Sequence, residues 1–337
     1  MNEAKEILTN SSLKTFRECP KKYMFSYEEG FEPAVKPEYF RFGSLWHVGL
    51  ETWEVNRDLD EALEAMNKEK GRLFDDEYTL FKAFALMETY HALYKDQPYT
   101  VFAIELPFRA PVINPDTGRE SKTFEYDGVF DGLYKDKAGR TILKESKTTS
   151  EDVSADSDYW RRLQMDSQIS GYYLGAEASG YKIESCLYDV VRKPMLSPYR
   201  ATPLENRKFT KEGKLYANQR EVDETPREFY ERLKADIQSR PEHYFARREI
   251  PRSMNDLTEH LHDVWHTGQT IHSFRKSGQW PRNTASCITL THTCQFWAVC
   301  SGQARIDDPS LYVKKDSAHP ELGKNIEKRE KEQKVAA

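Results

Sequence analysis

Hydrophobic side chains recur at helical spacing through the first third of the chain. Large apolar residues fall on one face around Trp46 and Trp53, as expected of helices that pack against a core. This pattern predicts helices at residues 39–56, 60–70 and 77–95. We therefore expect a helical N-terminal region over residues 1–98.

The period shortens to that of β-strands at Tyr99. The pattern that follows predicts three strands, then a helix and a fourth strand. These elements are expected at residues 100–108, 122–135, 140–148, 160–178 and 183–192. With the preceding helix, the order is helix, three strands, helix, strand. This is a mixed α/β (α+β) arrangement with its core at residues 99–193.

The chain after this core is more polar and less regular. We expect a third region over residues 194–302, made of a loop, two helices and a short strand. These elements are expected at residues 194–224, 226–239, 254–275 and 244–250. From residue 303 to 337 the chain is rich in Lys and Glu without periodicity, which predicts a polar, flexible tail.

Composition indicates a folded protein. The 337 residues are 38% hydrophobic, 12% aromatic and 31% charged, which excludes a mostly disordered chain. No apolar run approaches the length of about 18 residues that a membrane helix needs. The first residues lack the basic and apolar segments of a secretory signal. We therefore expect a cytoplasmic protein that does not bind a membrane.

Charge is unevenly distributed along the chain. Fifty basic and 55 acidic side chains give a net charge of −5, which excludes a uniformly basic nucleic-acid coat. Residues 51–96 hold 12 acidic and 6 basic side chains, whereas residues 200–252 hold 13 basic and 10 acidic ones. Contact with nucleic acid would thus be confined to a local groove. Two solvated surfaces of ordinary composition explain the same counts.

One predicted hairpin carries residues with the chemistry of a metal site. Glu145 and Lys147 alternate in a strand and so share a face, and Asp131 lies on the neighbouring strand. Two carboxylates that converge on one face suit Mg²⁺, which prefers oxygen ligands. A cross-strand salt bridge would explain the same residues. Asp127 shares the strand face of Asp131, and we choose Asp131 because its Gly-x-x-Asp setting fits better.

Three further residues complete a recognisable pattern. His47 lies on the helix before the sheet, and Gln168 and Tyr172 lie four apart on one face of the helix after the hairpin. The order of motifs resembles the RecB-like branch of the PD-(D/E)XK nucleases. The motifs are His47, Gly128-x-x-Asp131, Glu145-x-Lys147 and Gln168-x-x-x-Tyr172. The order of helices and strands is similar to the restriction-endonuclease-like core of that superfamily.

The resemblance implies a role for each of these residues. The implied ligands of Mg²⁺ or Mn²⁺ are His47, Asp131, Glu145 and the carbonyl oxygen of Ser146. Lys147 would be the catalytic lysine. Gln168 and Tyr172 would organise the site or contact the DNA strand.

The cysteines narrow the resemblance. In a reducing cytoplasm a clustered set is more often metal-binding or catalytic than disulfide-bonded. The arrangement of one early and three late cysteines resembles that of the iron–sulfur nucleases. These include the AddB-type nuclease domain, the CRISPR-adaptation nucleases and stand-alone phage relatives. The implied ligands of a 4Fe–4S cluster are Cys19, Cys287, Cys294 and Cys300. Their Cys-x6-Cys-x5-Cys spacing departs from the Cys-x2-Cys-x5-Cys of the first two groups, and a structural Zn²⁺ site is the alternative.

Arginines beside aromatic residues are candidate contacts with DNA. Such pairs suit single-strand binding through phosphate contacts and base stacking. They equally fit aromatic residues in a core and arginines in solvent. The candidates are Trp160, Arg161, Arg162, Arg247 and Arg248.

These patterns favour a metal-dependent DNA nuclease, an exonuclease that acts on single-stranded ends in recombination, repair or phage DNA processing. The alternative is a non-catalytic DNA-binding or structural subunit with a cysteine-ligated metal centre. The intact set of Asp131, Glu145 and Lys147 favours the enzyme, and an RNA nuclease also fits the residues. The chain has no Gly-x4-Gly-Lys-Ser/Thr phosphate loop, so a helicase or recombination protein would be a separate partner.

Overall fold

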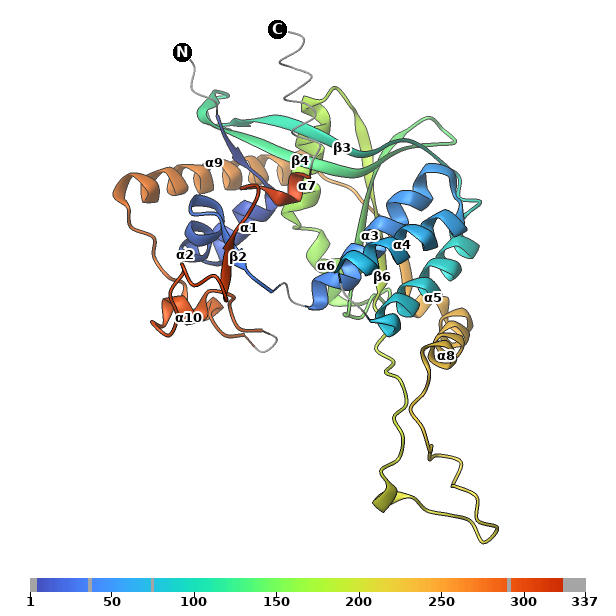
Figure 1. The fold of residues 1–337 in the computed structure, drawn as a ribbon. Helices are drawn as coiled ribbons and strands as arrows, with labels where there is room; N and C mark the ends of the chain where they lie inside the picture. The colour runs from blue at the N-terminus through green and yellow to red at the C-terminus, as the bar shows by residue number, and fades with distance from the viewer. Residues whose placement is uncertain (1–4, 36–37, 74–75, 290–291, 324–337) are drawn as a thin grey trace.

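The fold is that of a computed structural model, which describes residues 5–35, 38–73, 76–289 and 292–323 (Figure 1). The helices are α1 (Asn10–Glu18), α2 (Pro20–Tyr23), α3 (Glu38–Asn56), α4 (Leu59–Leu73), α5 (Glu77–Tyr94), α6 (Asp158–Leu163), α7 (Ser167–Ala178), α8 (Pro226–Ser239), α9 (Met254–Ser277) and α10 (Trp297–Cys300). The strands are β1 (Glu6–Leu8), β2 (Phe31–Pro33), β3 (Tyr99–Ile113), β4 (Glu120–Asp136), β5 (Thr141–Thr149), β6 (Ile183–Arg192), β7 (Phe245–Ile250) and β8 (Tyr312–Lys314). In these described ranges, no helix has both the length and the apolar character needed to span a bilayer.

A six-stranded mixed sheet organises the molecule in the order β1-β4-β5-β6-β7, with β3 also paired to β4. The antiparallel β3 follows β4 along most of its length, so β1 and β5 share the opposite edge of β4. The parallel β1 lies beside Phe124–Tyr126, and the antiparallel β5 lies beside Gly132–Lys135. Residues 127–131 of β4 therefore face a gap on that edge between the two neighbouring strands.

Helices cover both faces of this sheet (Figure 1). On one face α7 and α9 pack on β3, and α1 packs against both helices. The core on this face includes Phe124, Phe130 and Ile169. On the other face α3 contacts β3 and β5, and α4, α5 and α8 complete a second core around Trp46 and Trp53. The predicted mixed α/β class and the order helix, three strands, helix, strand are confirmed.

The single helix predicted over residues 160–178 is wrong, because this segment forms two helices. The chain leaves α6 after Leu163 and starts α7 at Ser167. Asp166 caps the second helix, since its carboxylate accepts hydrogen bonds from the backbone N–H groups of Gln168 and Ile169 at 2.9 and 3.1 Å. Aspartate is a favoured N-cap because its oxygen satisfies amides that have no partner within the helix.

The sheet draws strands from three of the regions that the sequence suggested were separate. β1 comes from the N-terminal region and pairs with β4, and β7 comes from the C-terminal region and pairs with β6. The expected tail also contains structure, since β8 pairs with β2 and buries Tyr312. Residues 324–337 of the tail lie outside the described residues. Segments from the N-terminal, central and C-terminal regions therefore pair within one sheet.

Residues 194–224 form a long arm that projects from the body of the molecule beside α8 (Figure 1). The arm is predominantly irregular, as predicted. Its two sides are joined by backbone contacts such as the hydrogen bond from Thr202 N–H to the Arg220 carbonyl at 2.8 Å and a bridge between Phe209 and Leu215.

Candidate active site

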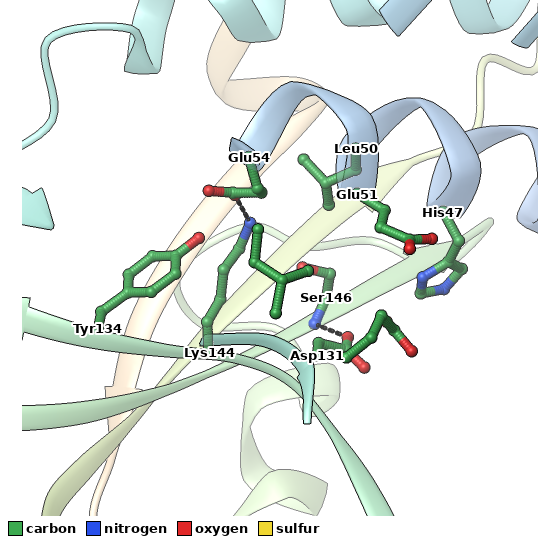
Figure 2. Close-up of a pocket in the computed structure, with 10 residues that line it drawn as sticks. His47, Leu50, Glu51, Glu54, Asp131, Tyr134, Lys144 and Ser146 are labelled. Atoms are coloured by element: carbon green, nitrogen blue, oxygen red, sulfur yellow. Dashed lines mark hydrogen bonds and ion pairs between the residues drawn. The ribbon is translucent and has the colours of Figure 1, made fainter. Parts of the chain in front are cut away.

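The site lies where β4 and β5 separate. The two strands pair from Lys135 and Thr141 as far as Gly132 and Lys144. Beyond this point, the backbone N–H of Ser146 on β5 donates a hydrogen bond of 2.8 Å to Oδ2 of Asp131 on β4 (Figure 2). The side chain of Asp131 thus takes the place of a backbone partner, and this contact holds its carboxylate against β5.

Glu145 and Lys147 share one face of β5, as their alternation predicts, and Lys144 and Ser146 share the opposite face. The Nζ atom of Lys147 forms an ion pair with Oε1 of Glu145. The glutamate side chain is completely buried, whereas about a third of the lysine side chain is exposed (35%). Lys147 is therefore the member of the pair that solvent or a substrate can reach.

The carboxylate of Glu145 is unusually basic for its type. Burial and the charge of Asp131 raise its pKa to about 7, against the opposing effect of Lys147. Its Oε2 atom is buried and accepts no hydrogen bond of good geometry from the described residues. Burial alone would lower the pKa of Lys147, but Glu145 and Asp131 together raise it above its ordinary value. The lysine is therefore charged at neutral pH.

Two glutamates that the motifs do not include lie beside these residues. Glu51 is one helical turn after His47 on α3, and both side chains face Asp131 and Ser146 (Figure 2). Glu105 is on β3 between the residues that pair with Gly132 and Phe130, with a φ of 48° that is rare for a residue with a side chain. Glu51 and Glu105, together with His47, Asp131 and Ser146, line a pocket of about 20 Å³. This volume has room for one water molecule or ion.

The charge density of this pocket shifts the acid–base behaviour of its residues. Burial, together with the carboxylates of Asp131 and Glu51, raises the pKa of Glu105 to about 8. Burial lowers the pKa of His47, against the opposing effect of Asp131. His47 is therefore neutral near pH 7 and can act as a ligand. The helical spacing of Glu51 and His47 could have identified Glu51 from the sequence, whereas Glu105 gave no signal.

Helix α7 brings Gln168 and Tyr172 to the Glu145 side of the sheet. The Gln168 amide Nε2 donates a hydrogen bond of 2.7 Å to the Tyr172 hydroxyl. Burial raises the pKa of Tyr172 well above its ordinary value, and the nearby Glu145 adds to the rise. The tyrosine is therefore a neutral hydroxyl next to the buried carboxylate.

Two glycines allow α7 to lie this close to the sheet. A Cβ atom on Gly128 of β4 or on Gly175 of α7 would lie 2.4 Å from the ring of Phe108. This ring also stacks on Phe130 with a centroid distance of 4.5 Å. Gly128, the glycine of the Gly-x-x-Asp motif, therefore serves packing: it makes room for the ring that supports α7.

The structure separates the two aspartates that the sequence left as alternatives. Asp127 accepts hydrogen bonds from the Arg109 guanidinium at 2.7 to 3.1 Å, and only 4% of it is exposed. Asp131 faces Ser146 and the pocket instead. Asp127 is thus engaged in a structural ion pair, and Asp131 is the aspartate beside Glu145.

Comparison with known proteins identifies the fold family. The sequence profile of the PD-(D/E)XK nuclease superfamily matches residues 7–301. The chain belongs to this superfamily. No curated protein matches the sequence. Among solved structures, a candidate exonuclease from Eubacterium rectale has a TM-score of 0.50 at 13% identity, over 94% of this chain and 93% of that one. This likeness shows a shared fold.

Two further solved structures are more distant. The protein SSO0001 has a TM-score of 0.36 at 12% identity, over 90% of each chain. A phage-related exonuclease from Haemophilus somnus 129PT has a TM-score of 0.34 at 11% identity, over 82% of this chain and 97% of that one.

PD-(D/E)XK nucleases typically use divalent metals such as Mg²⁺ or Mn²⁺, and the donor chemistry here fits such an ion. Asp131 and Glu145 provide carboxylates. The buried Oε2 of Glu145 has no hydrogen-bond partner among the described residues, so a cation could bind there. Within the described part of the chain, however, no three His, Cys, Asp or Glu side chains are grouped closely enough to hold a metal ion. The donors are thus neighbours rather than a preformed coordination shell.

A buried charge network lies behind the pocket, and it corrects the prediction for Arg247. Asp189 on β6 accepts hydrogen bonds from Arg247 at 2.8 Å and from the Tyr90 hydroxyl, and it lies 3.3 Å from Nζ of Lys144. Lys144 also forms an ion pair with Glu54 of α3 (Figure 2). Arg247 was expected to contact DNA, but its side chain is only 12% exposed and neutralises these buried carboxylates.

The other candidate DNA contacts divide between the interior and the surface. Trp160 is buried and its indole N–H donates a hydrogen bond of 3.0 Å to the Val153 carbonyl, so it cannot stack on a base without unfolding locally. Arg248 lies over the Trp160 ring, with 4.4 Å between the guanidinium carbon and the ring centroid. Arg161 and Arg162 are exposed, and each forms an ion pair with a nearby carboxylate.

The early and late cysteines lie in one part of the structure. Cys19 follows α1, and its Sγ accepts a hydrogen bond of 3.4 Å from the backbone N–H of Asn283. Burial raises the pKa of the Cys294 and Cys300 thiols, and Cys19 and Cys287 contribute to both rises. The described structure holds no metal-binding arrangement of these thiols. The docking of the last segment on α1 and α2 is nevertheless the long-range contact that a shared cluster would require.

Proposed function

We propose that the protein is a metal-dependent DNA nuclease, an exonuclease that acts on single-stranded ends. The observation that supports this most directly is the placement of Asp131, Glu145 and Lys147 where β4 and β5 separate. A separate helicase or recombination protein would supply single strands in recombination, repair or phage DNA processing.

Each residue has a role in this proposal. His47, Asp131, Glu145 and the Ser146 carbonyl would hold Mg²⁺ or Mn²⁺. Such an ion lowers the pKa of a bound water and neutralises charge at the phosphorus. The charged ammonium of Lys147, which is partly exposed, would orient the attacking water or stabilise the phosphate oxygens. Gln168 and Tyr172 would hold Glu145 and the strand in position.

The test is cleavage of end-labelled single- and double-stranded DNA with Mg²⁺, Mn²⁺ or a chelator. We expect Asp131→Asn, Glu145→Gln and Lys147→Ala each to lower the rate by about 10²–10³-fold or more, because each removes stabilisation of transition-state charge. DNA binding and folding should be retained. His47→Ala should have a smaller effect. Asp127→Asn, four residues from Asp131 on the same strand, is the matched control and should still cleave.

Different outcomes separate the alternatives. Wild-type cleavage by Glu145→Gln would refute the site assignment. DNA binding without cleavage in any metal would favour the non-catalytic subunit, and cleavage of RNA alone would favour an RNA nuclease. Degradation of circular single-stranded DNA at the rate of linear DNA would contradict an exonuclease.

We also propose that Cys19, Cys287, Cys294 and Cys300 bind a 4Fe–4S cluster with a structural role, as in the AddB-type branch. The mutual influence of the four thiols and the contact between Cys19 and Asn283 support this proposal. Anaerobically purified protein should be brown and hold about four irons. Serine at any of the four should bleach the colour and expose the chain to proteases, because ligation and folding are coupled. Cys186→Ser is the control and should stay brown. Colourless protein with one zinc would replace the cluster by the zinc alternative.

A further inference from the structure

A groove of about 490 Å³ leads away from Lys147 along the side of the sheet that carries α7. One of its walls is α1, and the other is formed by α6, α7 and the loop between them. A hydrogen bond of 2.7 Å from the Ser167 hydroxyl to Asn10 Oδ1 joins these walls. The side chains that matter here are Lys14, Arg17, Lys147, Arg162, Met165 and Gln168.

The groove is basic although the whole chain is acidic. Its lining includes four cationic residues and two carboxylates. Both carboxylates have partners in the protein, since Glu151 forms an ion pair with Arg162, and Asp166 caps α7. Lys14 and Arg17 therefore add positive charge to the wall formed by α1. A local positive groove of this kind attracts a phosphate backbone despite an unfavourable net charge.

Met165 is the one residue of this lining whose exposure is unusual for its chemistry. It lies in the loop between α6 and α7, and 91% of its surface is exposed. The rest of the lining is predominantly polar. An apolar, flexible side chain at the rim of a basic groove can gain contact area from the faces of bases, since methionine is among the residues that insert beside bases in DNA complexes.

We propose that this groove holds one strand of the substrate next to the cleaved bond, with phosphates bound by Lys14 and Arg17 and a base packed against Met165. The proposal rests on the nuclease function above and specifies its substrate. The volume of the groove is in the range of about 300–1,000 Å³ typical of small-molecule pockets, which gives room for a short length of one strand. On this proposal, a duplex end would open before one of its strands enters the groove next to Lys147.

The phosphate contacts can be tested without cleavage. Binding of a fluorescent single-stranded oligonucleotide would be measured in the Glu145→Gln background with a chelator, over a range of salt concentrations. Lys14→Ala and Arg17→Ala should each weaken binding and reduce the slope of log K against log salt by about 1, because each loses one phosphate contact. Lys137→Ala is the matched control. It removes the same charge from the β4–β5 turn, at the opposite end of β5 from Lys147, and should leave the slope unchanged.

The base contact has a different signature. Met165→Ala should weaken binding about fivefold without changing the salt slope, since no charge is lost. The effect should disappear on an oligonucleotide with abasic sites, on which Lys14→Ala should still act. Met254→Ala, which removes another exposed methionine (78%), is the control.

The outcomes distinguish this inference from the proposed function. One outcome is that the wild type cleaves DNA while Lys14→Ala, Arg17→Ala and Met165→Ala bind DNA like their controls. This would refute the groove as the strand-binding site and leave the proposed nuclease function intact. Absence of both cleavage and DNA binding in the wild type would overturn both. An equal Met165→Ala effect on abasic DNA, or tighter binding of duplex than of single strands, would refute the assigned base contact and single-strand path.

Discussion

Replacement of Arg247 by leucine should destabilise the protein strongly, even though the residue was first expected to lie on the surface. Its guanidinium lies among buried groups: two carboxylates, Glu54 and Asp189, balance the cations of Lys144 and Arg247. Burial raises the pKa of Asp189, but Arg247 and Lys144 outweigh it and lower the pKa below its ordinary value. Arg247→Leu would leave one uncompensated negative charge inside the molecule.

The magnitude follows from the cost of a buried, unpaired charge. Removal of one partner from a buried ion pair typically costs about 3–5 kcal/mol. In a chain of this size that corresponds to a fall in Tm of about 4–7 °C. Because the folded-state pKa of Asp189 is lowered in the wild type, its stabilising effect is present above the unfolded pKa of about 4 and is lost as the pH falls through the folded pKa. The deficit of Arg247→Leu should shrink on acidification, because without Arg247 the buried Asp189 of the variant takes up a proton at a higher pH than Asp189 of the wild type.

The assay is thermal and urea unfolding at pH 7 and near pH 4, followed by circular dichroism. Arg248→Ala, the next residue on β7, is the matched control. Its side chain lies over Trp160 outside the buried network, so we expect a loss of about 1 kcal/mol or less. The double variant Arg247→Leu with Asp189→Asn should recover part of the stability, because it removes the unpaired charge. Equal stabilities of the two arginine variants at pH 7 would refute the reasoning.

Two further predictions concern packing and pH. Gly175→Ala should destabilise the protein by about 1–3 kcal/mol in urea unfolding, because the new Cβ would lie 2.4 Å from the Phe108 ring. Gly71→Ala in α4 meets no atom within 4 Å and should instead stabilise by up to about 1 kcal/mol, so the same sign for both would contradict the packing argument. Burial lowers the pKa of His260 to about 4, helped by Arg17 and Arg252, so the unfolded chain binds more protons between pH 4 and 6.5. Stability should fall by up to about 3 kcal/mol as the pH drops through this range, and a His260→Leu variant with an unchanged pH profile would disprove this assignment.

Local periodicity was sufficient to predict most helices and strands. The helix expected at residues 226–239 is α8, and the one expected at 254–275 is α9. The break between α6 and α7 has one local sign, the N-cap residue Asp166, but no Gly or Pro occurs there to end the first helix. It is stabilised by a tertiary contact: Arg252 donates hydrogen bonds to the carbonyls of Leu163 and Asp166 at 2.8 and 2.9 Å. This second contribution comes from a residue 86 or more positions away, and the local pattern gives no sign of it.

The same distinction between local and distant partners explains which site residues were found. Asp131, Glu145 and Lys147 follow from the strand period and the motif order, and the structure places them at one end of the β4–β5 pair. Glu105 comes from β3 and reaches the pocket through a local backbone conformation that the residue type does not suggest. Arg17 and Met165 meet in one groove only because α1 packs beside α7.

Lys144 and Lys147 show the limit of a sequence argument most clearly. Both are charged residues in one strand, three positions apart, so they point to opposite faces. Lys147 remains partly exposed at the groove, whereas Lys144 is 2% exposed and is neutralised by Glu54 and Asp189. The Glu145-x-Lys147 motif indicates Lys147, but nothing near Lys144 in the chain predicts its burial, because the carboxylates around it come from α3 and β6. The motif was therefore enough to assign Lys147 to the chemistry, whereas the assignment of Lys144 to the core required the packing of α3 and β6 against β5.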